Sequence, residues 1–516
     1  MNSLTANSHV SDGATGQTPR QPNVLEQIPV WFLAVALVVL LVNRIGYHLF
    51  ATPLPDEAYY WLWGQHPALS YYDHPPMQAW FQAITTKIFG TSLFALRLPA
   101  VFSSIVFAWT LLWWAKNYDA SLCVKAKLAL LIAAFSSPLF FLFTGIVFND
   151  HVLIALLCIA SILGFKALDA VASSGRVNAP ALYGAALCIG LAGISKYNAS
   201  VFALGMFLAA AIFPRFRHVF RSPHLYLAGV VCLLCLTPVF WWNYTNSAAS
   251  FQYNLNDRLG HDPGIGGIAG RFVAFLVLTF MGLSPFLLVP MIRALKGPAR
   301  QPQWIDNWRL IGVTIFVVST GFCAVLTYFT HVLFYWNIIA FIAILPFALL
   351  TFKRSRAVMA HIAYGIATIC LINFNFMILP LSAPFGTPDN ESAIPFGWSE
   401  LTETAQELEH SQDVDFVMTS DYRTAAILAF LTGNLDVEVI ANRISQFTIW
   451  FDQDARAGQD ALILVSRWHP MSDKISDRFE SIEKLSRHTV KRLGYPMTTY
   501  RFFVGRNYQP EPTVSN

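Results

Sequence analysis

Apolar segments long enough to cross a membrane recur along most of this chain, and no other feature of the sequence restricts its fold as strongly. A helix needs about 20 predominantly apolar residues to span the hydrocarbon core of a bilayer. Of the 516 residues, 55% are hydrophobic and only 12% are charged, whereas soluble domains contain about 25% charged residues. We therefore predict a polytopic α-helical membrane protein with about eleven transmembrane helices. The segments lie at residues 29–49, 93–115, 124–143, 150–170, 181–195, 199–213, 224–242, 268–292, 309–330, 333–351 and 357–380.

Basic residues predict the orientation of these helices. With a cytoplasmic N-terminus, every loop that falls on the inner side contains Lys or Arg, as the positive-inside rule requires. An odd number of helices then places all residues after 380 on the outer, periplasmic side. The predicted inner loops are 116–127, 165–180, 213–224, 293–309 and 352–356.

Composition divides the chain into three parts. Residues 1–28 are mostly polar and lack an apolar run, so we predict a disordered cytoplasmic tail. Residues 29–380 form the transmembrane domain, whose first periplasmic loop spans 50–92. Residues 381–516 are more charged and contain none of the seven cysteines.

The C-terminal part alternates apolar runs typical of strands with segments typical of helices, which predicts a soluble α/β periplasmic domain. Its length of about 135 residues is sufficient for a core of its own. The expected strands start near Asp415, Val437, Ala461 and Thr499, and the expected helices cover 422–431 and 478–491.

Two adjacent carboxylates follow the first apolar segment. Asp56 and Glu57 begin a run rich in aromatic residues that includes Tyr59 and Tyr60, and a second polar pair, Asp73-His74, precedes two prolines. Charge near a bilayer is costly and marks substrate paths or reacting centres, while aromatic residues suit the membrane interface. The alternative is a solvated loop that only joins two helices.

Further polar residues fall on the predicted outer side. Each has a structural alternative: Asp150 as a helix N-cap, Lys196 extending to the interface, Arg258 in an exposed pair with Asp257, and His74 as a loop hydrogen-bonding group. Together, acids beside bases at one edge of a bundle suit a lipid-phosphate headgroup.

The first loop carries a family resemblance. Residues 55–63 (PDEAYYWLW) and 69–77 (LSYYDHPPM) resemble the first periplasmic loop of bacterial GT-C glycosyltransferases. The branch concerned contains the aminoarabinose lipid A transferase and enzymes like the dolichyl-phosphate-mannose protein mannosyltransferases. Arg97-Leu-Pro, Asn149-Asp150, Gly193-Ile-Ser-Lys-Tyr and residues 422–430 and 442–450 are similar to the same branch.

The resemblance implies transfer of a sugar from a polyprenyl-phosphate donor on the periplasmic side of the bacterial inner membrane. The catalytic candidates are Asp56, Glu57 and Asp150. Such a transfer needs a base for the acceptor hydroxyl, for which we select Asp56, with Glu57 adjacent but directed elsewhere. Asp150 would orient the acceptor or support Asp56. Lys196 and Arg258 would hold the departing phosphate. The other candidates for substrate binding are Tyr59, Tyr60, Asp73, His74 and Arg97.

Several alternatives remain open. The acceptor could be lipid A, lipopolysaccharide core, another envelope glycan or a protein, and the sugar is not specified. No Asp-x-Asp motif occurs among the candidate acids, so a divalent metal is possible but not expected, and no other cofactor is predicted. A lipid-linked sugar transporter or flippase would show polar, broken helices at mid-membrane, where charge is scarce here. A non-catalytic envelope scaffold is the third hypothesis. No nucleic-acid signature occurs.

Overall fold

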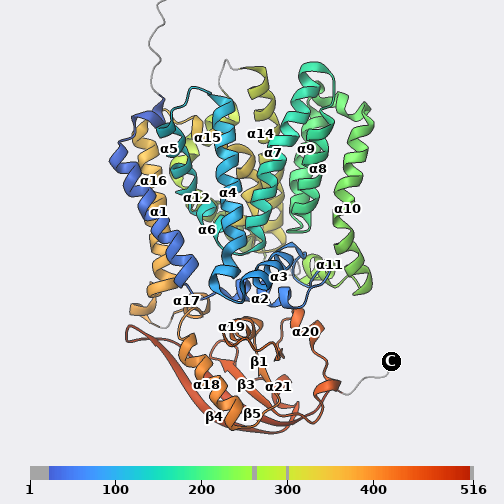
Figure 1. Ribbon diagram of the computed structural model, residues 1–516, viewed down its shortest axis with the longest axis vertical. Helices are drawn as coiled ribbons and strands as arrows, with labels where there is room; N and C mark the ends of the chain where they lie inside the picture. Colours follow the sequence, from blue (N-terminus) through green and yellow to red (C-terminus); the bar gives the residue numbers. More distant parts are fainter. Residues whose placement is uncertain (1–22, 258–263, 298–301, 387, 512–516) are drawn as a thin grey trace, which may run out of the picture.

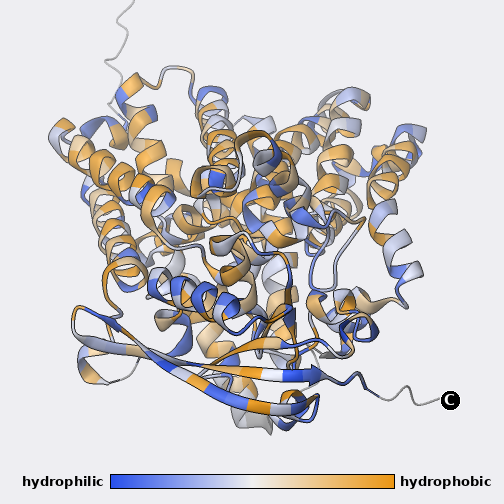
Figure 2. Cartoon of the chain, turned by 60° about the horizontal axis from the view of Figure 1, so that its bottom comes forward, coloured by the Kyte–Doolittle hydropathy of each residue, from blue (hydrophilic) through white to orange (hydrophobic). Residues whose placement is uncertain are grey.

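The computed structural model describes residues 23–257, 264–297, 302–386 and 388–511, arranged as a helical bundle above a smaller domain that contains a sheet (Figure 1). Apolar residues dominate the bundle helices, whereas polar and apolar residues alternate along the strands (Figure 2). The two domains meet along the first loop of the chain, which lies between them.

All eleven predicted apolar segments are helical over most of their length. The bundle helices are α1 (Val30–Phe50), α4 (Leu93–Tyr118), α5 (Val124–Phe135), α6 (Pro138–Gly145), α7 (Asn149–Ser174), α8 (Ala179–Gly193), α9 (Ala199–Ile212), α10 (Pro223–Thr245), α12 (Gly264–Leu283), α13 (Leu288–Lys296), α14 (Gln303–Phe329), α15 (Ile338–Leu350) and α16 (Ser355–Asn373).

The length and composition of the observed helices support fewer membrane spans than the eleven predicted. Among the described residues, seven helices are long and apolar enough to cross a membrane, or up to nine if each of two bent pairs is one span. One pair is α5 and α6, which meet at 81°, and the other is α9 and the 3-10 helix η2 (Pro214–Arg221), which meet at 106°. α8 and the stretch Phe334–Leu350 are apolar but shorter. The protein is a multi-pass membrane protein, and the count of eleven stays a prediction.

The start of the chain differs from the predicted tail. Asn23 caps a short 3-10 helix, η1 (Val24–Gln27), through a reciprocal bond with Glu26. Leu25 and Ile28 are buried in the main core of the bundle. The prediction of disorder over residues 1–28 was therefore wrong for residues 23–28, because these two apolar side chains pack against helices. Residues 1–22 lie outside the described part.

The loop at residues 50–92, predicted to be periplasmic, is folded rather than open. It contains α2 (Pro55–Gln65) and α3 (Met77–Phe89), with Pro55 at the first position of α2, where its missing N–H costs no hydrogen bond. Residues 57–64 are all buried, because α2 packs against α3 on one side and α19 (Tyr422–Thr432) of the C-terminal domain on another.

The C-terminal domain contains a five-stranded mixed sheet in the order β2-β1-β3-β5-β4. The strands are β1 (Phe416–Thr419), β2 (Val437–Val439), β3 (Ala461–Ser466), β4 (Phe479–Arg492) and β5 (Tyr495–Tyr508). β1 pairs in parallel with β2 and β3, and β5 runs antiparallel to β3 and β4. α19 lies on the bundle side of this sheet, while α18 (Trp398–Ser411) packs against α19 and β3.

One prediction in this domain was wrong. Residues 478–491 were expected to be helical, but they form β4, which pairs with β5 over 14 residues. Leu493 and Gly494 connect the two strands, and both have positive φ, at 48° and 86°. A two-residue turn of this kind matches the twist of a hairpin. The hairpin therefore overrides the weak helical preference of a polar segment.

The orientation of the bundle can be tested with one native and one introduced cysteine. Cys123 is exposed in the predicted inner loop 116–127, and Ser411 is exposed in the C-terminal domain. We expect a membrane-impermeant thiol reagent to label Ser411→Cys in intact spheroplasts, while Cys123 reacts only after the membrane is permeabilised. If Cys123 were labelled in intact spheroplasts and Ser411→Cys only after permeabilisation, the predicted topology would be reversed and the first loop would be cytoplasmic.

Candidate active site

Asp56 lies in the first turn of α2, at the boundary between the two domains. Its side chain is half-buried, and the hydroxyl of Tyr422 donates a hydrogen bond to Oδ1 at 3.4 Å. Burial raises the pKa of Asp56, the charge of Arg423 opposes the rise, and nearby Asp73 adds to it, so that the pKa lies above its ordinary value. A carboxylate with a raised pKa is a better proton acceptor.

Asp73 organises a second set of contacts beside Asp56. The hydroxyl of Tyr59 donates to Oδ2 of Asp73 at 3.0 Å, and Arg443 forms an ion pair with Oδ1. The same guanidinium donates to the hydroxyl of Tyr253 at 2.9 Å. The backbone N–H of Gln446 donates to the Tyr59 hydroxyl at 2.7 Å. Residues from the first loop, the bundle and the C-terminal domain thus meet at one buried carboxylate.

Asp150 and Lys196 form a buried ion pair at the start of α7. Lys196 Nζ lies 2.7 and 2.9 Å from the two carboxylate oxygens of Asp150, and 4.8 Å from the ring centre of Tyr335. Asp150 is not the helix cap, because Phe148 occupies that position. Lys196 is only 9% exposed, so its side chain does not extend to water. The geometry therefore matches neither an N-cap role for Asp150 nor an extension of Lys196 to the membrane interface.

Lys196 also lines a cavity of about 360 Å³ with a mainly apolar wall. Apolar side chains of α14 contribute most to this wall, Ile339 of α15 adds to it, and His74 reaches it from the first loop. His74 packs edge-on against the ring of Tyr60, with ring centres 6.1 Å apart. Burial and the neighbouring charges of Asp56 and Asp73 raise the pKa of Tyr60. Tyr60 therefore links the carboxylates of Asp56 and Asp73 to His74, which lines the cavity.

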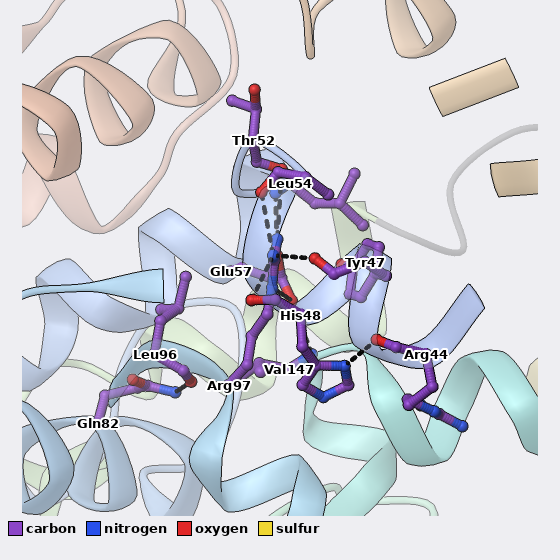
Figure 3. Close-up of polar contacts among 11 residues, drawn as sticks. Arg44, Tyr47, His48, Thr52, Leu54, Glu57, Gln82, Leu96, Arg97 and Val147 are labelled. Atoms are coloured by element: carbon purple, nitrogen blue, oxygen red, sulfur yellow. Dashed lines mark hydrogen bonds and ion pairs between the residues drawn. The ribbon is translucent and has the colours of Figure 1, made fainter. Parts of the chain in front are cut away.

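Glu57 and Arg97 form a separate, fully buried network (Figure 3). Arg97 Nη2 lies 2.7 Å from Glu57 Oε2, and its Nη1 donates to the carbonyl oxygens of Tyr47 and Ala51. Burial alone would raise the pKa of Glu57, but the charge of Arg97 and three hydrogen-bond donors leave it below the ordinary value. Glu57 is directed away from Asp56 and paired with Arg97, so its candidate catalytic role does not match this geometry.

The candidate role of Arg97 in substrate binding is wrong in this structure. All contacts of its guanidinium are internal, and they connect α1, α2 and α4. We expect Arg97→Met to lower the free energy of unfolding by about 3–5 kcal/mol, because it leaves the Glu57 charge buried without its partner.

Thermal unfolding in detergent measures this loss. Arg215→Met provides the matched control, since it removes a partly exposed pair with Asp306 that should contribute at most about 1 kcal/mol. Equal losses for the two variants would contradict the assignment of Arg97 to the structural core.

The chain is similar to several known proteins in sequence and in fold. The family model described as dolichyl-phosphate-mannose-protein mannosyltransferase matches residues 73–242. The lipid A galacturonosyltransferase RgtD of Rhizobium johnstonii is 23% identical over 276 residues, which cover 51% of this chain and 54% of that protein. The crystal structure of ArnT from Cupriavidus metallidurans, bound to undecaprenyl phosphate, superposes with a TM-score of 0.60 at 13% identity. That superposition covers 92% of this chain and 97% of ArnT. The chain shares the fold of ArnT.

Within this ArnT-like fold, the sequence-predicted residues separate into three groups. Asp56, Tyr59, Tyr60 and Asp73 lie together at the domain boundary, and His74 packs on Tyr60 and lines the cavity with Lys196, the partner of Asp150. Glu57 and Arg97 are structural. Arg258 lies outside the described residues. Among the described residues, no group of three or more His, Cys, Asp or Glu side chains is arranged to hold a metal ion.

The C-terminal residues at the site were not predicted to be functional. Tyr422, Arg443 and Gln446 all contact the first loop. They lie in the segments 422–430 and 442–450, whose resemblance to the ArnT-like branch was the available signal.

Proposed function

We propose that this protein is an integral-membrane glycosyltransferase. It transfers a sugar from a polyprenyl-phosphate donor to a cell-envelope acceptor on the periplasmic face of the bacterial inner membrane. One observation carries the proposal: Asp56, a carboxylate of raised pKa, lies in the same loop as His74, and His74 and Lys196 both line one apolar cavity. A general base and a cation that lines an apolar cavity are the parts that this reaction needs.

The donor would place its phosphate at Lys196 and its isoprenoid chain along the apolar wall formed by α14 and α15. Asp150 holds the ammonium group in place through its two oxygens. The solved ArnT contains undecaprenyl phosphate, which supports a donor of this class. Lys196 acts as a point charge, without the bidentate geometry of an arginine.

In the reaction, Asp56 accepts the proton of the acceptor hydroxyl while the acceptor oxygen attacks the anomeric carbon. The bond from that carbon to the phosphate oxygen breaks, and the phosphate keeps the electron pair. Negative charge then grows on the phosphate, where Lys196 stabilises it. Tyr422 and Tyr60 flank Asp56 and help to exclude water.

A lipid acceptor is the favoured class, since RgtD is described as a lipid A galacturonosyltransferase. The sugar is a hexose or a pentose derivative. Mass spectrometry of lipid A, core oligosaccharide and glycoproteins from a deletion strain tests both points. Loss of one sugar from one of these fractions, restored by the wild-type gene, supports the proposal, while unchanged spectra in all three contradict it.

The alternative functions predict different sites. A transporter or flippase needs polar residues through the membrane midplane, but the proposed site lies at the domain boundary on one side of the bundle. A scaffold would not require a base, so its test is the substitution of Asp56 described in the Discussion.

We expect transfer to be independent of divalent metal. The positive charge of Lys196 supplies what a metal ion would otherwise provide at the phosphate, and Asp150 is already paired with it. Transfer rates should be unchanged after dialysis against a chelator. Loss of transfer on chelation, followed by recovery with magnesium or manganese but not with sodium, would show that the acids bind an ion.

A further inference from the structure

A second cavity, remote from Lys196, lies where the C-terminal domain touches the outer ends of α1 and α16. Its volume is about 310 Å³. The lining comes from four places: the end of α1, the turn after α16, the start of α18 and the tip of the β4–β5 hairpin. Two of the lining residues, Lys491 and Arg492, are cationic and exposed.

The position of this cavity relative to the membrane follows from two spans. The candidate spans Val30–Phe50 and Ser355–Ile378 end beside it. Arg492 Nε donates to the carbonyl oxygen of Ile378 at 3.0 Å, and its Nη2 donates to that of Met377 at 3.4 Å. The tip of the hairpin is therefore held at the level where the helices leave the bilayer, as the reach of the two long strands in Figure 1 shows.

Exposed apolar side chains occur in the lining of the cavity at Phe50, directly after the lining residue Arg492 at Leu493, and at Phe385, in the chain between the lining segments 376–377 and 395–400. Phe385 is 91% exposed, Phe50 is 77% exposed, and Leu493 at the hairpin tip is 66% exposed. Large apolar side chains beside Lys and Arg are the composition of surfaces that enter the headgroup region of a bilayer. The three residues come from separate parts of the chain, so the tertiary structure assembles this apolar rim.

The inside of the cavity is suited to an anion. No described carboxylate lies within ion-pair distance of Lys491. The acid in the lining, Glu400, lies 3.4 Å from His488. The start of α18 also lines the cavity, and Gly397 caps this helix without a side-chain hydrogen bond. Gly397 has a φ of 78°, and a Cβ atom there would meet Val490 at 2.4 Å, so the close approach of helix and hairpin requires glycine.

We propose that this cavity binds the phosphate headgroup of an anionic phospholipid in the outer leaflet, with Leu493 and Phe385 inserted among the acyl chains. Lys491 and Arg492 provide the charge, and the amides of α18 add hydrogen-bond donors. The bound lipid would attach the C-terminal domain to the membrane surface. This inference does not depend on the proposed transferase activity, and its test does not use that activity.

Binding of the lipid headgroup is measured with the purified full-length protein in a neutral detergent. Short-chain phosphatidylglycerol, short-chain phosphatidylcholine and inorganic phosphate are titrated separately by calorimetry. We expect saturable binding of phosphatidylglycerol that weakens roughly tenfold in Lys491→Gln, because one charge-assisted bond is lost. Lys484→Gln, an exposed lysine elsewhere on β4, is the matched control and should bind as the wild type does.

Three outcomes would overturn the proposal. They are equal binding of phosphatidylcholine and phosphatidylglycerol, equal binding by wild type and Lys491→Gln, and inorganic phosphate binding as tightly as the lipid. The last outcome would indicate a site for a free anion.

Membrane insertion is tested separately with a spin label. The label is attached to Leu493→Cys in a chain whose seven native cysteines are replaced, and the protein is placed in vesicles with or without phosphatidylglycerol. We expect the label to be accessible to oxygen rather than to a water-soluble nickel chelate, and more so with phosphatidylglycerol present. A label at Leu435→Cys, an exposed leucine before β2, should remain accessible to the chelate. Equal chelate access at both positions would contradict insertion of the hairpin.

Discussion

Asp56→Asn should abolish most sugar transfer while leaving the fold intact. The substitution removes the proton acceptor with almost no change in volume, and an amide oxygen can still accept the hydrogen bond from Tyr422. A positioned general base contributes roughly 10²–10⁴ in rate, so turnover should fall by that factor. The measurement is transfer from a defined polyprenyl-phosphate sugar in detergent, with protein amounts normalised.

Two further measurements make this result specific. Asp306→Asn, which removes a partly exposed carboxylate at the start of α14, should leave turnover unchanged. Asp56 must be ionised to accept a proton, and its pKa is raised. As the pH is lowered, turnover of the wild-type enzyme should therefore begin to fall at a higher pH than it would with an ordinary aspartate as base. Arg423→Met should move this acid limb to still higher pH, since the charge of Arg423 holds the pKa down. Turnover of Asp56→Asn within about twofold of wild type would exclude the base and favour the scaffold hypothesis.

Lys196→Ala should depress turnover more than it weakens donor binding. The charge that Lys196 neutralises grows only as the bond to phosphate breaks, so its loss is felt mainly in the transition state. Removing one such group costs roughly 10²–10³ in rate. Lys196→Arg should recover part of the loss, because it keeps the charge but changes the geometry. Turnover and apparent donor affinity are measured for each variant.

The ion pair with Asp150 requires a control, because breaking a buried pair also destabilises the protein. Lys196→Met leaves Asp150 buried and unpaired, whereas Lys196→Met combined with Asp150→Asn removes both charges. Thermal stability should be lower in the single variant than in the double variant. Turnover should remain low in both. Recovery of turnover in the double variant would mean that Lys196 serves only to neutralise Asp150.

Adjacent residues of α2 illustrate what a sequence motif leaves open. Asp56 and Glu57 are both acids at the start of one helix, and successive residues of an α-helix point about 100° apart. Asp56 consequently faces α19, where Tyr422 and Arg423 lie, while Glu57 faces α1 and α4 and pairs with Arg97. The sequence predicted that the two would diverge, but it did not predict which structural partner Glu57 would take.

The C-terminal domain shows the same limit for secondary structure. Its buried strands β1 and β3 were predicted correctly because continuous apolar runs are a local signal. β4 was wrongly predicted to be a helix, and most of its residues are polar and not buried. Its conformation depends on pairing with β5 through the turn at Leu493 and Gly494, and such pairing is not a local property.

The sequence by itself determined the membrane class, the approximate places of the helices and the acid-aromatic loop, because apolar length and composition are properties of neighbouring residues. Only the tertiary structure decided the composition of the site. Asp56 meets Tyr422 across 366 residues of sequence, and Asp73 meets Arg443 across 370. Contacts at such separations depend on how the C-terminal domain docks against α2 and α3, and no local pattern encodes that docking.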